Sequence, residues 1–180
     1  MPPFSEAGSS MTTETKTTDQ PRTTSDSRSE YTEICLPNDT NMLGTMLGGR
    51  VMHLVDVCGA IAAMRHARGP VVTASVDQMT FLHPIHVGEL VRLKSQVNRV
   101  FHSSMEVGVK VWVENLHTGG MKHTSSAYLT FVALDSQGAR VRIPPILPET
   151  EEEHRRYAQA AKRRANRLAM KNRTRAEPEE

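Results

Sequence analysis

The chain has 180 residues, which is enough for one domain with a sizeable core and additional tails. Its 22 lysines and arginines nearly balance 20 aspartates and glutamates, so the formal net charge of +2 gives no argument for binding nucleic acid or a membrane surface. Two cysteines, Cys35 and Cys58, favour a reducing compartment over a disulfide scaffold. Because no segment approaches the ~20 consecutive apolar residues of a membrane span and no secretory signal is visible, we expect a cytoplasmic protein.

Residues 1–30 are predicted to be a disordered tail. They are crowded with serine and threonine, and Phe4 is their only aromatic residue, so they cannot bury enough apolar surface to offset the entropy lost on ordering. The folded domain is therefore expected over residues 31–148. It opens with a short strand at residues 31–36, which Pro37 ends.

A long helix is predicted over residues 48–67, ended by Pro70. Within residues 51–64 only His53 and Asp56 are polar. A helix that is apolar almost all round must be buried on most of its sides. We therefore expect this helix at the centre of the fold.

Four strand signals follow without another helix. They cover residues 71–81, 89–100, 105–114 and 123–134. In the third, Val107, Val109 and Val111 alternate with Lys110 and Trp112, which is the period of a strand with one buried face. Short turns between these strands predict antiparallel neighbours. Trp112 faces the polar side, where we expect it to mark a subunit interface.

A second helix is predicted over residues 150–171, within a basic C-terminal segment at residues 149–175. Thr150 and Glu153 have the spacing of a capping box. Residues 176–180 are expected to fray. The order of strand, apolar helix, four antiparallel strands and outer helix predicts an α+β fold. In it, a curved antiparallel sheet of about five strands wraps round one long central helix, which is the hot-dog arrangement.

Three features converge on the apolar helix. Asp56 is costly to desolvate, so it is either a structural acid, for example paired with His53, or a functional carboxylate. Gly48 and Gly49 would offer free backbone N–H groups to a developing oxyanion, although a tight turn is the simpler interpretation. The amide of Asn41 could position water or polarise a carbonyl, or could be an ordinary turn residue.

The spacing of these residues also carries a family resemblance. The pattern Asn41-x-x-Gly44-x-x-x-Gly48-Gly49, followed by Asp56, resembles the signature of the hot-dog acyl-CoA hydrolases. That family includes broad-specificity bacterial acyl-CoA thioesterases and the cytosolic acyl-CoA hydrolase of vertebrates. The resemblance therefore implies a thioesterase that hydrolyses acyl-CoA to a free fatty acid and CoA.

The resemblance covers most of the chain, from about residue 31 to residue 157. Further similar stretches lie at residues 71–77, 104–107 and 147–151. One position departs from the pattern, because some members carry a histidine just before the paired glycines and this chain has Leu47 there. This departure argues against a role for a histidine at that position, but it does not affect the roles of the asparagine and the aspartate.

The resemblance implies roles for the three site residues. Asp56 would act as general base on water or as nucleophile on the thioester carbonyl, and the N–H of Gly49 would receive the oxyanion. Asn41 would orient water or the carbonyl. In this family the asparagine and the aspartate of one site come from different hot-dog units. The minimal unit is then expected to be a homodimer, either on its own or as part of a trimer of dimers, with the trimer of dimers favoured, and with acyl-CoA as substrate and no cofactor.

Coenzyme A needs contacts of its own, because its phosphates require arginine or lysine. The candidates are Arg65, Arg99, Lys162, Arg163, Arg164 and Arg167. For the last four, a solvated charged helix face is the plainer interpretation. The residues expected beside the thioester and the pantetheine arm are Gly48, Thr80, Phe81, Ser103 and Ser104.

Other functions stay open. A resemblance to the hot-dog enoyl-CoA hydratases would require a different pattern, in which an aspartate and a nearby histidine enter the helix. Here no histidine follows Asn41 before His53. A non-catalytic acyl-CoA-binding module would not need Asn41, Gly49 and Asp56 together. Nucleic-acid binding is not expected, because the basic last helix lacks interleaved aromatic residues. The eight histidines do not form a zinc pattern, so no metal site is expected.

Overall fold

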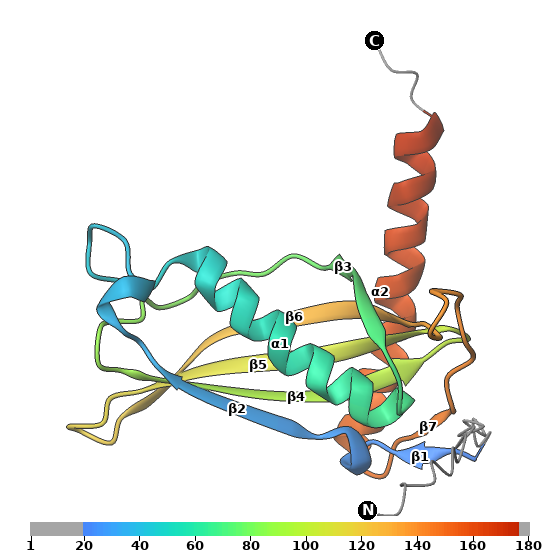
Figure 1. The fold of residues 1–180 in the computed structure, drawn as a ribbon, viewed down its shortest axis with the longest axis horizontal. Helices are drawn as coiled ribbons and strands as arrows, with labels where there is room; N and C mark the ends of the chain where they lie inside the picture. Colours follow the sequence, from blue (N-terminus) through green and yellow to red (C-terminus); the bar gives the residue numbers. More distant parts are fainter. Residues whose placement is uncertain (1–19, 177–180) are drawn as a thin grey trace, which may run out of the picture.

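The computed structural model describes residues 20–176. In this part of the chain the helices and strands are β1 (Arg22–Thr23), η1 (Ser25–Ser27), β2 (Ser29–Ile34), η2 (Pro37–Asp39), α1 (Gly48–Ala67), β3 (Val71–Val76), β4 (Leu90–Val100), β5 (Ser104–Glu114), β6 (Met121–Ala133), β7 (Ile146–Leu147) and α2 (Glu151–Ala176). An antiparallel sheet has the strand order β2-β4-β5-β6-β3. Helix α1 lies across one face of this sheet and α2 lies behind the other (Figure 1). The predicted hot-dog arrangement with five strands is confirmed.

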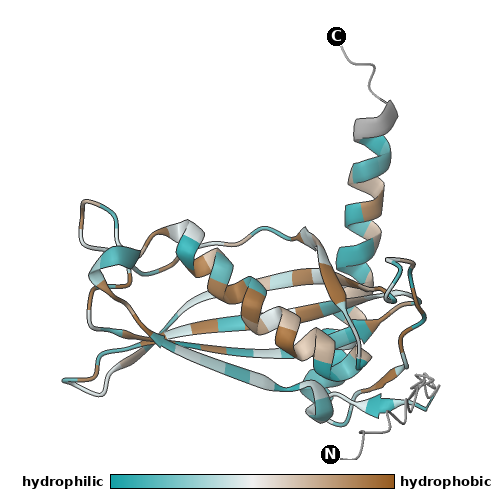
Figure 2. Ribbon diagram, in the orientation of Figure 1, coloured by the Kyte–Doolittle hydropathy of each residue, from teal (hydrophilic) through white to brown (hydrophobic). Residues whose placement is uncertain are grey.

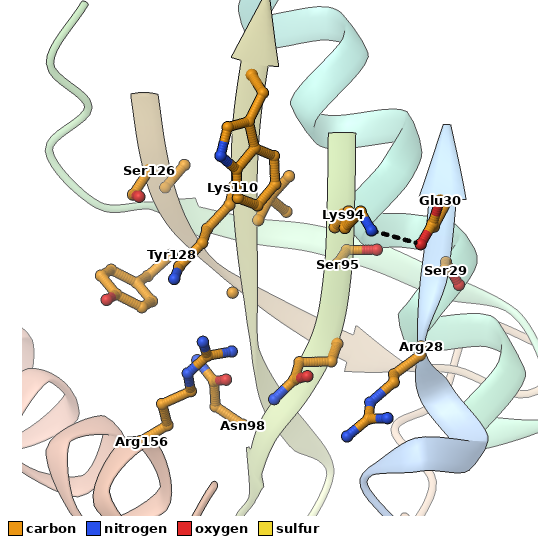
Figure 3. Close-up of a pocket in the computed structure, with 15 residues that line it drawn as sticks. Arg28, Ser29, Glu30, Lys94, Ser95, Asn98, Lys110, Ser126, Tyr128 and Arg156 are labelled. Carbon is orange, nitrogen blue, oxygen red and sulfur yellow. Dashed lines mark ion pairs between the residues drawn. The ribbon is translucent and has the colours of Figure 1, made fainter. Parts of the chain in front are cut away.

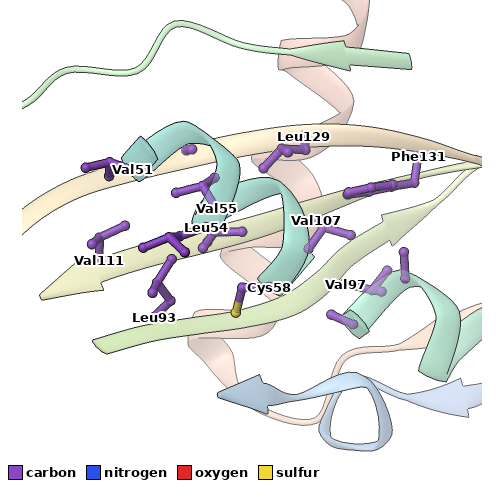
Figure 4. Close-up of a cluster of buried hydrophobic side chains, with 14 of the residues drawn as sticks. Val51, Leu54, Val55, Cys58, Leu93, Val97, Val107, Val111, Leu129 and Phe131 are labelled. Carbon is purple, nitrogen blue, oxygen red and sulfur yellow. The ribbon is translucent and has the colours of Figure 1, made fainter. Parts of the chain in front are cut away.

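The core lies between α1 and the sheet. Because side chains alternate along a strand, every second residue of the three central strands faces the helix. Figure 4 shows four side chains of α1 above residues of β4, β5 and β6. The α1 residues are Val51, Leu54, Val55 and Cys58, and all are buried. Gly59 lets the sheet approach α1 closely, since a Cβ there would lie 3.2 Å from the ring of Phe131.

Only one side of α1 is buried within its own chain. On the opposite side His53 is exposed, and Met52 and Met64 retain 45% and 44% of their accessible surface. The prediction that this helix is buried on most sides is therefore wrong for a single chain, because one sheet covers only one side of a helix. Asp56 lies half-buried beside this open face.

The ordered chain begins earlier than the sequence predicts. The disordered tail was expected to reach residue 30, yet β1 pairs in parallel with β7, and β2 starts at Ser29. Hydroxyl groups make this possible. The buried Ser27 donates to the carbonyl of Thr24 at 2.7 Å and accepts the N–H of Val97 at 3.0 Å. A polar segment is thus ordered by hydrogen bonds instead of apolar burial, while residues 1–19 lie outside the described part.

The strand after α1 is shorter than predicted. It was expected to run to residue 81, but β3 ends at Val76. The chain then continues beside β6 through single hydrogen bonds, from the N–H of Asp77 to the carbonyl of Tyr128 and from the N–H of Leu82 to that of Thr124, both 2.9 Å. The other strands end within two residues of their predicted limits.

Helix α2 is attached to the sheet mainly through polar contacts. Its predicted capping box is confirmed, because Thr150 and Glu153 exchange side-chain to backbone hydrogen bonds of 3.1 and 3.3 Å. Figure 2 shows α2 largely hydrophilic, in contrast to α1. Its anchor is Arg163, which binds the fully buried carboxylate of Glu106 through two nitrogens at 2.6 and 3.0 Å and lies 3.6 Å from the ring of Tyr128.

We expect the variant Arg163→Met to lower the free energy of unfolding by about 3 kcal/mol, because it leaves the buried charge of Glu106 without its cation. Urea denaturation measures this loss. The matched control is Arg155→Met, which breaks a solvent-exposed pair and should cost less than about 0.5 kcal/mol. Equal stability of the two variants would contradict an ionic anchor. Adding Glu106→Gln to Arg163→Met should recover part of the loss.

Candidate active site

Asp56 is held by a threonine that the sequence analysis did not single out. The hydroxyl of Thr73 on β3 donates to Oδ1 of Asp56 at 2.6 Å. The β3–β6 register shifts between Thr73 and Ser75, and this irregularity sets which side chains of β3 face α1. A hydrogen bond to a carboxylate is stronger than a neutral one, so it fixes the carboxyl group and leaves Oδ2 for other partners. Sequence could have indicated Thr73 only as a hydroxyl residue on the strand that follows α1.

The N-terminus of α1 is open. Leu47, the residue before the helix, provides no side-chain cap, and its carbonyl accepts the N–H groups of Arg50 and Val51. Within the described residues the N–H groups of Gly48 and Gly49 donate to no acceptor. A Cβ at Gly49 would meet no atom within 4 Å, so an incoming oxygen can approach the backbone. Two free donors at the positive end of a helix can hold an anion or an oxyanion.

Asn41 organises the loop before α1 with one end of its amide. Its Oδ1 accepts the N–H of Leu43 at 2.9 Å and contacts the N–H and hydroxyl of Thr45 at 3.3 and 3.2 Å. Gly44 closes the loop with a φ of 70°. The amide NH₂ of Asn41 is therefore the end that can donate to a ligand, and the side chain is exposed.

These groups do not meet within one chain. Gly48 and Asp56 are eight residues apart on α1, which is about 12 Å along a helix that rises 1.5 Å per residue. The loop of Asn41 lies beyond the N-terminal end of that helix, farther from Asp56 (Figure 1). One thioester carbonyl therefore cannot contact all three groups of the same chain.

A pocket of about 280 Å³ adjoins the open helix end. Phe81 forms one wall, and a Cβ at Gly48 would lie 3.5 Å from its ring. Val51 and Ile85 make the pocket partly apolar. Gly48 and Phe81, both predicted near the substrate, thus lie together. The carbonyl of Thr80 is already bound by the hydroxyl of Ser125 at 2.8 Å.

The other residues predicted to contact coenzyme A lie elsewhere. Ser104 pairs with Val132 on β6, whereas Thr80 is bound to Ser125, seven residues earlier on the same strand, so the two groups are separated by roughly 23 Å. Ser103 neighbours Ser104 in the β4–β5 turn. The predicted site residues therefore divide into two groups at opposite ends of the sheet.

Most of the predicted phosphate ligands are engaged inside the chain. The guanidinium of Arg99 lies 4.1 Å from the ring of Tyr157, and Arg65 donates to the carbonyl of Arg28. On α2, the remaining contacts join Arg163 to Glu106, Arg164 to Phe101 and Ser104, and Arg167 to Asp77. Lys162 is exposed. These arginines connect α2 to the sheet, and a role in phosphate binding would have to compete with those contacts.

Cys58 does not have the surroundings of a nucleophile. Its side chain is fully buried, and burial raises the pKa of its thiol, so the reactive thiolate is disfavoured. It contacts the hydroxyl of Ser95 at 3.3 Å as part of the core. Within residues 20–176, no cluster of three or more His, Cys, Asp or Glu side chains could hold a metal ion.

Comparison with known proteins gives consistent matches. Residues 43–119 match the family model described as Thioesterase superfamily. The chain is 44% identical to "Uncharacterized acyl-CoA thioester hydrolase YkhA" of Bacillus subtilis (strain 168), over 83% of this chain and 89% of that one. A crystal structure of an apo-hexameric acyl-CoA thioesterase matches with a TM-score of 0.81 at 40% identity, covering 84% of this chain and 97% of that chain.

A third match bears on the site. The acyl-CoA hydrolase of Staphylococcus aureus, solved with butyryl coenzyme A, coenzyme A and coenzyme A disulfide, has a TM-score of 0.80 and 35% identity, covering 86% of this chain and 94% of that chain. Structures of its single alanine variants also match. They replace an asparagine, an aspartate fifteen residues later and a threonine seventeen residues after that aspartate. From its fold and these matches, the chain belongs to the acyl-CoA thioester hydrolases of the thioesterase superfamily.

Proposed function

We propose that the protein hydrolyses acyl-CoA thioesters at a site built from two copies of the chain. The observation that supports this proposal most directly is the separation of about 12 Å between the free N–H groups at the start of α1 and Asp56 on the same helix. Groups this far apart can reach one carbonyl only if each comes from a different copy. The open face of α1, with Met52, His53 and Met64 exposed, is where the second helix would pack.

The proposed chemistry uses the free oxygen of Asp56. As a general base, Asp56 takes a proton from water while the water oxygen attacks the thioester carbonyl. As a nucleophile, its carboxylate attacks the carbonyl directly and water then hydrolyses the anhydride. In both routes the N–H of Gly49 from the other copy holds the oxyanion, and the C–S bond breaks to release CoA. Thr73 keeps the carboxyl group oriented in either case.

Spacing in a relative supports this set of residues. Asn41, Asp56 and Thr73 are separated by fifteen and seventeen residues, as are the three positions replaced by alanine in the Staphylococcus aureus acyl-CoA hydrolase. The amide NH₂ of Asn41 is free to orient the water or the carbonyl. We assign Asn41 to the copy that supplies the helix N-terminus, because its loop leads into that end of α1.

For the assembly, we propose a homodimer as the catalytic unit and a trimer of such dimers as the complete enzyme. The hexameric relative supports the larger assembly. We also propose a cytoplasmic location, which agrees with Cys35 and Cys58 both being free thiols. Across residues 20–176, neither helix combines the length and the apolarity that a membrane span requires.

We expect Asp56→Ala to lower kcat for thioester hydrolysis by about 10²–10⁴-fold, the usual contribution of a positioned acid or base. Release of the CoA thiol measures this, over acyl-CoA substrates of several chain lengths. An unchanged melting temperature would show that the variant folds. Full activity of a folded Asp56→Ala enzyme would refute the proposed role, and hydration of crotonyl-CoA by the wild type without thiol release would favour the hydratase alternative.

Mixing two inactive variants tests the shared site. Asn41→Ala and Asp56→Ala should each lose most activity, but a 1:1 mixture that is co-expressed or refolded together should recover about a quarter of the wild-type rate, because half of the dimers are mixed and each of those has one intact site. Mixing without subunit exchange is the control. If both residues acted within one chain, every site in the mixture would lack one of them and no activity would return.

Thr73→Val should lower kcat about tenfold with little change in KM, because it removes the hydrogen bond that orients Asp56 but no contact to the substrate. Thr73→Ser keeps the hydroxyl and should restore most of kcat. Steady-state kinetics of both variants give the comparison. If Thr73→Ser were as impaired as Thr73→Val, the methyl group and not the hydrogen bond would be the important feature.

A further inference from the structure

A second pocket, of about 360 Å³, lies on the outer face of the sheet, on the side away from α1. It is bounded by β4, β5 and β6, by the start of β2 and by the first half of α2 (Figure 3). The thickness of the sheet separates it from Asp56 of the same chain. The hydrolytic mechanism assigns no role to this pocket.

The floor of the outer pocket is shaped by a bulge and a glycine. Val97 pairs with Val107 and Arg99 pairs with Glu106, so Asn98 is an extra residue on β4. Its amide reaches across β5, where Nδ2 donates to Glu106 at 3.1 Å. A Cβ at Gly108 would lie only 2.8 Å from that nitrogen, so a side chain here would displace the amide of Asn98, and glycine leaves the floor without a side chain.

Two polar atoms around this floor lack partners. Asn98 is 3% exposed and its Oδ1 has no hydrogen-bond donor, and the buried Nε2 of Gln96 has no acceptor. Buried polar atoms are nearly always paired, so an unpaired acceptor and an unpaired donor in one pocket indicate a missing partner. A purine base offers hydrogen-bond donors and acceptors side by side on its edge, which can satisfy both amides.

The walls of the outer pocket carry aromatic rings and positively charged side chains. Tyr128 and Trp112 both line the pocket, and bases stack on such rings. Four of the lining side chains are cationic: Arg28, Lys94, Lys110 and Arg156. Three of them have carboxylate partners, in Glu153, Glu30 and Glu152 respectively for Arg28, Lys94 and Arg156. Among the described residues Lys110 forms no direct ion pair, although the pKa of Glu152 is lowered by Arg156 and, more weakly, by Lys110. Figure 3 shows Lys110 on the same side of the pocket as Tyr128.

We propose that the outer pocket binds a purine nucleotide. The base lies over Gly108, with its edge on Gln96 and Asn98 and its ring beside Tyr128 and Trp112. The phosphates face Lys110 and the neighbouring cations, since phosphate groups are bound by lysine and arginine. The nucleotide is either free in solution or the nucleotide end of a coenzyme A held by a neighbouring copy.

Calorimetric titration of ADP into the full-length protein tests this site. Gln96→Leu removes the unpaired donor at similar volume, and Lys110→Ala removes the lining cation that forms no direct ion pair. Each should weaken ADP binding about tenfold, the effect of one good hydrogen bond or charge contact. Lys122→Ala, an exposed lysine on β6 that does not line the pocket, should leave the affinity unchanged. Melting temperatures confirm that each variant is folded.

Titration of coenzyme A into the same variants separates the two sources. If Gln96→Leu weakens ADP alone, the occupant is a free nucleotide; if it weakens coenzyme A, with or without ADP, the occupant is the nucleotide end of that molecule. If neither ligand binds more weakly to Gln96→Leu and Lys110→Ala than to wild type, the proposal is wrong. Asp56→Ala should bind ADP like the wild type, so the result does not depend on the proposed catalytic role of Asp56.

Discussion

The rigidity of one helix constrains the rest of this structure. Helix α1 carries two free N–H groups at its start and a carboxylate two turns later, and its backbone hydrogen bonds fix the distance between them. No change of side-chain rotamer brings these groups to a single carbonyl. The open face of α1, the projecting loop of Asn41 and the exposed β3 therefore share one explanation. In the proposed function, they belong to a site whose other half is a second copy of the chain.

The two faces of the sheet hold their helices through different interactions. Toward α1, alternating apolar side chains such as Leu93 and Val111 pack against the helix, and this attraction has little directional preference. Toward α2, the buried Glu106 and Arg163 attach the helix through charge and geometry. The apolar face can tolerate conservative changes of shape, whereas the polar face depends on single atoms being matched. The unpaired Nε2 of Gln96 and the unpaired Oδ1 of Asn98 lie on this second face.

Sequence predicted the elements that depend on local patterns. The bounds of α1 were predicted correctly, because Gly48 and Pro70 bracket a continuous apolar helix, and the valine alternation of β5 located that strand. Prediction from sequence failed where a segment is ordered by contacts with residues far away in the chain. Ser27 is ordered by the backbone of Val97, seventy residues away, and no composition rule indicates that bond.

The same limit applies to the candidate site. Asp56 and Gly49 could be proposed as candidates from sequence, because an acid in an apolar helix is unusual and because the spacing of Asn41, the paired glycines and Asp56 resembles that of the acyl-CoA hydrolases. The hydroxyl of Thr73 reaches Asp56 through the irregular pairing of β3, which a strand pattern does not reveal. Of the arginines considered as phosphate ligands, Arg163 and Arg167 pair with Glu106 and Asp77 within the chain. Charge alone does not distinguish a ligand-binding arginine from one that joins two elements.

The edge position of β3 has a consequence for how the enzyme behaves in solution. β3 pairs with β6 on one side, and within residues 20–176 its other side is open, with backbone groups available for another strand. If two such edges join, subunit association completes both a sheet and a catalytic centre. Activity then falls on dilution together with melting temperature, because mass action controls both. A cell could thus tune turnover through the amount of protein it makes, without any separate inhibitor.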